Sequence, residues 1–119
     1  MSWKLDKSRP ICPQMCEQIC VKIASGEFKP SERLLSVREV AVNAGVNPNT
    51  VQKSFEQLES KGIIYSVRGS GWYVSEQTEP AKNAVNELYA TKTQDYFSQM
   101  NALGLSDEQV KKYVEEWTI

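Results

Sequence analysis

Residues 36–58 read SVREVAVNAGVNPNTVQKSFEQL, and they carry the signals of two helices separated by a short turn. Ser36 and Glu39 match a capping box, in which a hydroxyl and a carboxylate each accept a backbone N–H at the start of a helix. Gly45 is placed to end this helix, because glycine adopts a backbone conformation that other residues resist. The pattern therefore predicts a first helix of about two turns, at 3.6 residues per turn.

A second helix is predicted to start directly after the turn. Asn47 is a favourable N-cap, and Pro48 stands at the first helical position, where its missing N–H costs nothing. Apolar residues then recur at helical spacing, and we interpret them as core: Val51, Phe55 and Leu58. The turn from Gly45 to Asn47 has about the length that a helix-turn-helix needs.

The flanking residues predict one helix before this motif and a hairpin after it. Residues 11–25 place apolar side chains at every fourth position, at Ile11, Met15, Ile19 and Ile23. Residues 33–35 are read as a short strand or an extended segment. The β-rich runs IIYSV and WYV flank the four-residue link Arg68-Gly69-Ser70-Gly71, a pattern typical of a hairpin.

The chain beyond the hairpin is predicted to be helical. Residues 75–80, SEQTEP, are polar and end in proline, so we expect a linker there. Residues 81–103 have a loose helical pattern, and Gly104 interrupts it. Ser106 and Gln109 form a second capping box, which starts a last helix with the apolar face Val110, Tyr113, Val114 and Trp117.

These elements define a mainly α fold with a small β-hairpin. Residues 1–76 are expected to form a winged helix-turn-helix domain, and residues 77–119 a short two-helix dimerisation region. The tail is too small to enclose a typical small-molecule pocket, of about 300 Å³ or more, by itself. Its apolar face is better explained by pairing with another copy, and an unknown small-molecule effector would then bind between subunits.

The composition excludes several classes of protein. The chain has 119 residues, 24% of them charged, and a net charge of -1, so it is an ordinary small globular protein without a strongly basic tail. It has no apolar run near the roughly 18 residues of a membrane span and no signal peptide, so we expect no membrane partner and a cytoplasmic location. It contains no histidine, the commonest general base and metal ligand. We therefore expect no enzyme, no catalytic residues, no metal site and no cofactor.

Three cysteines, Cys12, Cys16 and Cys20, share one stripe of the helix predicted at residues 11–25. An odd number does not suggest a disulfide framework. Cys12 and Cys20 would lie about 12 Å apart along the helix axis, too far for one zinc ion with thiolate bonds of about 2.3 Å. We interpret the thiols as small buried hydrophobes, and whether they sense a metal ion or an oxidant stays open.

The polar residues of the helix-turn-helix suit DNA. A recognition helix brings its N-terminal residues to base edges in the major groove, and its first amides favour phosphate. Asn and Gln bond to adenine, and Lys reaches guanine or phosphate, which suits Asn47, Asn49, Gln52 and Lys53 to DNA, while Pro48 and Thr50 lie on the same N-terminal turn. Arg38 is placed to reach the DNA backbone. Arg68 and Gly69, at the tip of the hairpin, suit the minor groove.

The charges along the chain are unevenly distributed. Cations outnumber acids within residues 33–73, and acids outnumber cations within residues 78–119. A monomer with so few cations would bind DNA weakly, since phosphate contacts supply much of the affinity. A two-fold dimer would double them, and its recognition helices would meet half-sites about one helical turn apart, hence a palindromic operator in double-stranded DNA.

Several segments together resemble the GntR family of bacterial transcriptional regulators: SGEFKP (25–30), SVREVA (36–41), GVNPNTV (45–51), LE (58–59), GII (62–64) and RGSG (68–71). The resemblance covers roughly residues 10–75. The VNPNTVQ run and the short tail are similar to the YtrA-like subfamily, whose members are dimeric repressors, often of operons for ABC-type transporters.

The resemblance implies DNA contacts at Ser36, Arg38, Asn47, Pro48, Asn49, Thr50, Gln52, Arg68 and Gly69. The family pattern favours Gly at position 31 and Pro at position 35, where this chain has Ser31 and Leu35. Both departures concern the rigidity of the turn before the helix-turn-helix more than contact with bases.

The sequence leaves a second function open, a winged-helix protein-interaction module without DNA binding. That function predicts that Arg38, Gln52 and Arg68 can be neutralised without loss of function. An enzyme is disfavoured, because the chain has no nucleophile with a credible base and no phosphate-binding loop. The operator, the regulated genes, the inducing signal and the sign of regulation are not specified by the residues.

Overall fold

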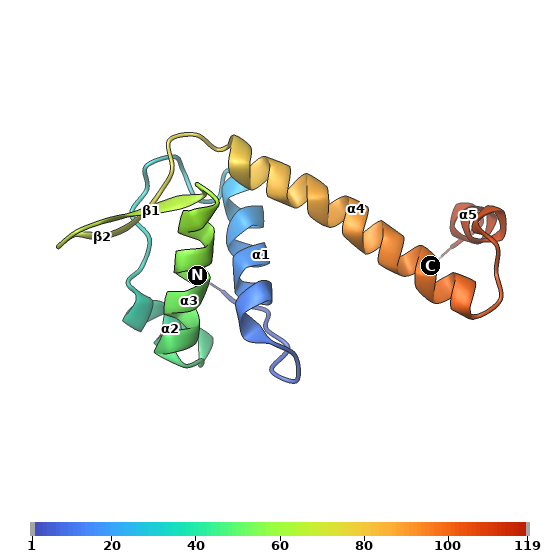
Figure 1. The fold of residues 1–119 in the computed structure, drawn as a ribbon, viewed down its shortest axis with the longest axis horizontal. Helices are drawn as coiled ribbons and strands as arrows, with labels where there is room; N and C mark the ends of the chain where they lie inside the picture. The colour runs from blue at the N-terminus through green and yellow to red at the C-terminus, as the bar shows by residue number, and fades with distance from the viewer. Residues whose placement is uncertain (1, 119) are drawn as a thin grey trace. The chain divides into compact units, whose positions relative to one another are not determined.

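The computed structural model describes residues 2–118. They form five helices and one two-stranded sheet, in the order α1 (Ile11–Ala24), α2 (Val37–Ala44), α3 (Pro48–Ser60), β1 (Ile64–Val67), β2 (Gly71–Val74), α4 (Glu79–Ala102) and α5 (Asp107–Glu115) (Figure 1). The chain divides into two compact units, one up to Val85 and one from Asn86. The order of elements up to β2 is that of a winged helix-turn-helix, as the sequence predicts.

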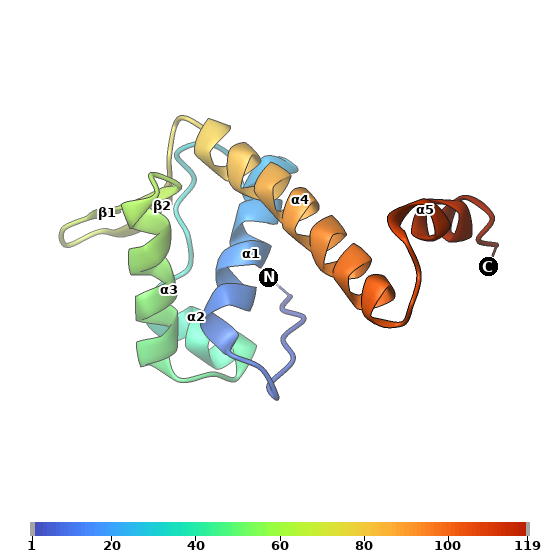
Figure 2. The same ribbon diagram turned by 45° about the vertical axis from the view of Figure 1, so that its right-hand side comes forward.

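The core of the first unit lies between α1 and α3, which pack side by side (Figures 1 and 2). Of the residues that periodicity singled out, Ile11 is half-buried and the others are buried: Met15, Ile19 and Ile23 from α1, and Val51, Phe55 and Leu58 from α3. The ring of Phe55 meets that of Trp72 edge to face, with centroids 5.4 Å apart, which joins the hairpin to this core.

The helix-turn-helix forms where its capping signals predict. The Ser36 hydroxyl accepts the N–H of Glu39 at 3.1 Å, and the Glu39 carboxylate accepts the N–H of Ser36 at 3.1 Å. Gly45 ends α2 with φ 67° and ψ 41°, the left-handed conformation that glycine tolerates. The Asn47 side chain accepts the N–H of Asn49 at 2.8 Å and so caps α3.

The hairpin pairs β1 with β2 in antiparallel register, from Ile64 opposite Val74 to Val67 opposite Gly71. The expected four-residue link is therefore wrong by one residue, because Gly71 already belongs to the ladder and the link is residues 68–70. Arg33 bridges to Tyr73 and Leu34 donates its N–H to the Trp72 carbonyl at 2.8 Å, so the segment before α2 is extended along β2.

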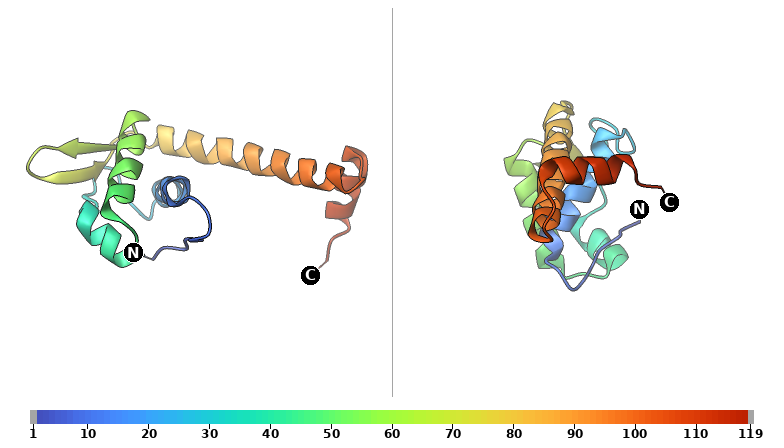
Figure 3. Two further views of the ribbon diagram at one scale, coloured as in Figure 1. Left: turned by 60° about the horizontal axis from the view of Figure 1, so that its bottom comes forward. Right: turned by 90° about the vertical axis from the view of Figure 1, so that its right-hand side faces the viewer.

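The linker predicted at residues 75–80 is too long, because α4 already begins at Glu79. The N–H of Lys82 donates to the Thr78 carbonyl at 3.1 Å, and Pro80 fits the first turn of a helix, which needs no N–H there. α4 is one continuous helix (Figure 3), and its buried residues Ala81 and Val85 belong to the core of the first unit.

The second unit contains the rest of α4 and α5. The capping box of Ser106 and Gln109 forms as predicted, and Val110 is fully buried. Trp117, expected on the apolar face of this helix, lies after its C-cap Glu116, although its ring remains 5.9 Å from that of Tyr113. None of the helices in residues 2–118 combines the length and hydrophobicity that a membrane span requires.

Candidate DNA-binding surface

One side of α3 is buried against α1 and the other is open to solvent. The side chains of the sequence-predicted contact residues on the open side are exposed, namely Asn47, Pro48, Asn49, Gln52 and Lys53. Thr50 is half-buried, and its carbonyl accepts the hydroxyl of the buried Ser54 at 2.8 Å. The start of α3 thus presents amide side chains and one ammonium group that no described carboxylate neutralises.

The first amides of α3 are less available than the sequence suggested. Pro48 has no N–H, the N–H of Asn49 is taken by the cap, and the N–H of Thr50 donates to the Asn47 carbonyl at 3.0 Å. The expectation of unpaired N–H groups for phosphate is therefore wrong here. Attraction for an anion at this end rests on side chains and on the helix dipole.

Ser36 and Arg38 lie on the first turn of α2, and both are exposed. The Ser36 hydroxyl is engaged in the capping box. Hydrogen bonds from Ser36 hold the pKa of the Glu39 carboxyl below its usual value, so Glu39 is occupied by the cap. Arg38 makes no ion pair with any residue in the described part of the chain, which leaves its guanidinium free for a phosphate.

The hairpin projects from α3 on the side opposite α1 (Figures 1 and 2). Arg68 and Gly69 at its tip are exposed, and Gly69 has φ 79°, a conformation that side chains resist. The N–H of Ser70 closes the tip by donating to the Val67 carbonyl at 2.9 Å, and the Ser70 hydroxyl contacts that of Tyr73. These contacts order the turn at residues 68–70, from which the Arg68 side chain extends.

Arg33 is a residue of this surface that the sequence analysis missed. Its guanidinium donates to the Ser70 carbonyl at 2.6 Å, and a Cβ added at Gly71 would lie 3.4 Å from Arg33 Nε. Arg33 thus anchors the tip of the hairpin to the segment before α2. The partners are 37 residues apart, and the only signal was the extended character of residues 33–35.

Cys20 is buried in the core of the first unit, whereas Cys12 and Cys16 are half-buried, and Cys16 contacts α3. The Cys16 thiol donates to the Ser54 carbonyl at 3.5 Å, and burial raises the pKa of this thiol to about 12. Burial also raises the pKa of Cys20. Residues 2–118 hold no group of three or more side chains arranged for a metal ion. These features favour the packing interpretation.

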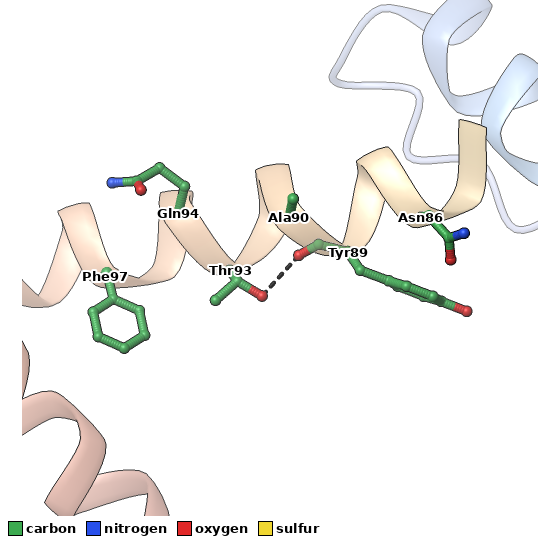
Figure 4. A pocket seen from close by; sticks show the side chains of 6 residues that line it. All are labelled: Asn86, Tyr89, Ala90, Thr93, Gln94 and Phe97. Carbon is green, nitrogen blue, oxygen red and sulfur yellow. Dashed lines mark hydrogen bonds between the residues drawn. The ribbon is translucent and has the colours of Figure 1, made fainter. Parts of the chain in front are cut away.

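Two hollows lie on the second unit. The first, along α4, is lined by side chains from successive turns of this single helix, with Tyr89 and Phe97 at its two ends (Figure 4). The second is a groove of about 850 Å³ between α4 and α5, lined among others by Tyr96, Phe97, Met100, Tyr113 and Trp117. The groove is lined mainly by aromatic and aliphatic side chains, whereas half of the residues that line the first hollow are polar, and neither lining contains a carboxylate or a thiol.

The chain matches one protein family, described as "Bacterial regulatory proteins, gntR family", over residues 14–74. It is 34% identical to the HTH-type transcriptional repressor YtrA of Bacillus subtilis (strain 168), over 92% of this chain and 85% of YtrA. It is 31% identical to the uncharacterized HTH-type transcriptional regulator YhcF of the same strain, over 99% of this chain and 98% of YhcF.

Solved structures agree with these relatives. A GntR family transcriptional regulator from Listeria monocytogenes superimposes with a TM-score of 0.81 at 34% identity, covering 96% of this chain and 100% of that one. The DNA-binding domain of AraR in complex with its operator ORE1 superimposes with a TM-score of 0.53 at 27% identity, covering 63% of this chain and 94% of AraR's. The winged helix-turn-helix fold is thereby confirmed.

Proposed function

The chain belongs to the GntR family of bacterial regulatory proteins, and we propose that it acts as a dimeric repressor that binds a palindromic operator in double-stranded DNA. The observation that carries this proposal is the exposed start of α3. Its open side holds Asn49, Gln52 and Lys53 within two helical turns, beyond a core that fixes the helix against α1. Amide side chains and a lysine in this position are the groups that read base edges in the major groove.

The contacts that we propose divide into two kinds. Asn49, Gln52 and Lys53 read bases, with Asn47, Pro48 and Thr50 along the same turn of the helix. Ser36 and Arg38 hold the phosphate backbone, and Arg68 with Gly69 enters the minor groove beside it. The fixed base that Arg33 gives to the hairpin supports the last assignment, because an ordered tip loses less conformational freedom on binding.

Residues 77–119 are proposed as the dimerisation region, with a second copy of this chain as the occupant of the groove between α4 and α5. Large exposed apolar side chains are concentrated in the second unit: Tyr89, Tyr96, Leu103, Tyr113, Val114 and Trp117. Monomeric proteins rarely expose contiguous apolar surface of this kind. Paired copies would cover it and would carry two recognition helices, which gives the operator its two-fold symmetry.

The regulated genes are proposed by similarity alone. YtrA-like members often repress operons of ABC-type transporters, and the YtrA repressor of Bacillus subtilis covers most of this chain. We extend that expectation to this protein. An effector bound between subunits would then release the protein from its operator.

The test is selection of bound duplexes from random DNA by the purified protein, followed by anisotropy titration of the enriched duplex. We expect an inverted repeat with half-sites about one helical turn apart. Gln52→Ala and Arg68→Ala should each weaken binding by about tenfold or more, whereas Lys29→Ala, an exposed cation after α1, should not.

Three results would contradict the proposal. If no duplex is enriched, the protein-interaction module is the better account. The same holds if replacing Arg38, Gln52 and Arg68 leaves function intact. If the protein sediments as a monomer at every concentration that binds DNA, the dimer is wrong. Trp117→Ala should shift the sedimentation equilibrium towards monomer, with Val42→Ala, an exposed apolar residue of α2, as its control.

A further inference from the structure

The residues before α1 form an arm that is fixed along this helix. Gln18 exchanges two hydrogen bonds with the backbone of Lys4, at 3.1 and 2.8 Å. Gln14, one turn earlier, exchanges two with the backbone of Asp6, at 2.7 and 2.9 Å. The side chains of Trp3 and Leu5 pack against the core. The arm therefore runs along α1 towards its N-terminal end and is held there by paired contacts.

The arm delivers Lys7 to the turn between α2 and α3. Lys7 Nζ donates to the carbonyl oxygen of Gly45 at 2.9 Å, across 38 residues of sequence. The approach is close, because a Cβ added at Gly45 would lie 3.0 Å from Lys7 Nζ. Gly45 is two residues before Asn47, the cap of α3, so the ammonium group lies beside the start of that helix.

The charge of Lys7 is not neutralised within the described chain. The neighbouring carboxylate, Asp6, is turned to other groups, since it accepts from Ser8 and pairs with Arg9 at 3.1 Å. An ammonium group has three donors, and Gly45 uses one of them. Lys7 is exposed, so the other two face solvent.

A lysine in this place has two possible roles. It donates a hydrogen bond at the C-terminal end of α2, where the helix dipole favours a cation. It also lies next to the N-terminal end of α3, where the dipole disfavours a cation unless an anion is also present. The first amides of α3 are already occupied, so a phosphate at this turn would need a donor from elsewhere. Lys7 is such a donor, and it lies outside residues 14–74, the part of the chain that the family match covers.

We propose that Lys7 binds a phosphate of the DNA backbone, and that the arm extends the DNA-binding surface beyond the helix-turn-helix and the hairpin. This inference rests on the proposed function. The hydrogen bond to Gly45 fixes the ammonium group beside the turn before DNA arrives. One phosphate next to the first bases read by α3 is then held by the arm.

The experiment is an anisotropy titration of the full chain against salt concentration, with a fluorescein-labelled duplex enriched by the wild-type protein from a random pool. Lys7→Gln should lower the slope of log affinity against log salt by about 1.8, the contribution of two phosphate contacts, one from each subunit of the proposed dimer. Lys7→Arg keeps the cation and should keep the slope. Lys4→Gln removes the same charge from the same arm and should leave the slope unchanged.

A wild-type slope in Lys7→Gln overturns the inference, because a lysine that only completes α2 alters stability and not the number of phosphates bound. A second measurement on the wild-type chain does not depend on a variant's folding. Acetylation of Lys7 by an N-hydroxysuccinimide ester should slow when the duplex is added, while that of Lys29 should not. Equal rates with and without the duplex also overturn the inference. Failure to enrich any duplex refutes the proposed function instead.

Discussion

Replacement of Gly45 by alanine tests how the arm and the turn stabilise one another. Gly45 has φ 67°, and an alanine held there costs about 1–2 kcal/mol, offset by about 0.5 kcal/mol because the unfolded chain loses freedom. The new Cβ would lie 3.0 Å from Lys7 Nζ, so the ammonium group must shift by a few tenths of an ångström, and we expect this shift to break its hydrogen bond. Its hydrogen bond to Gly45 is worth about 0.5–1 kcal/mol. The free energy of unfolding should fall by about 1–2.5 kcal/mol in total.

The two contributions separate in a double-mutant cycle with Lys7→Ala. Without the ammonium group no hydrogen bond remains to be lost, so Gly45→Ala should then cost only the backbone term, about 0.5–1.5 kcal/mol. The coupling energy between the two positions should be about 0.5–1 kcal/mol.

Urea unfolding followed by tryptophan fluorescence measures all four variants, because Trp3 and Trp72 pack against the core of the first unit. Coupling below about 0.3 kcal/mol, within the scatter of independent sites, would refute the reasoning and make the contact between Lys7 and Gly45 energetically irrelevant.

Three further predictions concern the first unit, and urea midpoints measure each of them. Ser31 has φ 64°, so Ser31→Gly should stabilise the protein by about 0.5 kcal/mol, and a lower midpoint would show that the serine side chain matters more than its backbone. Ser36→Ala removes the cap of an eight-residue helix and should cost about 1 kcal/mol, whereas an unchanged midpoint would mean that α2 is held by packing alone. The pKa of Cys16 is raised from 9.0 to about 12, so above pH 9.0 the unfolded thiol ionises first and stability is lost as the pH rises towards 12. Cys16→Val should lose less stability over that range than the wild type, and parallel curves would contradict the burial of this thiol.

Local signals made the helix-turn-helix predictable from sequence. A capping box, an Asn-Pro start and a glycine stop act over a few residues, so the bounds of α2 and α3 follow from the chain itself. The start of α4 was misplaced because proline signals both a break and a first helical turn, and only the bond from Lys82 to Thr78 distinguishes the two.

The contacts that order the candidate site were not predictable in the same way. Lys7 meets Gly45, and Arg33 meets Ser70, across more than 30 residues each. Neither pair has a periodicity or a motif, because a single side chain that reaches a distant carbonyl leaves no pattern in sequence. The exposed side of α3 was predictable, since its period follows from the buried side. In contrast, only the structure shows that the backbone N–H groups at the start of α3 are already hydrogen-bonded.

Position 31 illustrates how a departure from a family pattern becomes a physical statement. The GntR pattern favours glycine there, and Ser31 nevertheless adopts the left-handed conformation while its N–H donates to the Val74 carbonyl at 2.9 Å. The fold thus imposes this backbone angle on a residue that carries a side chain. The serine retains the turn at the expense of local strain.

The first turns of α4 contribute to the stability of the winged helix-turn-helix that precedes them. Ala81 and Val85 are 1% and 7% exposed within the same core cluster as α1 and α3. A chain cut after the hairpin would lose both side chains, at a cost of about 2 kcal/mol for the valine alone. Residues 2–76 alone would therefore melt earlier than the intact protein, and any ligand that unwinds the beginning of α4 would loosen the packing of α3 from a distance.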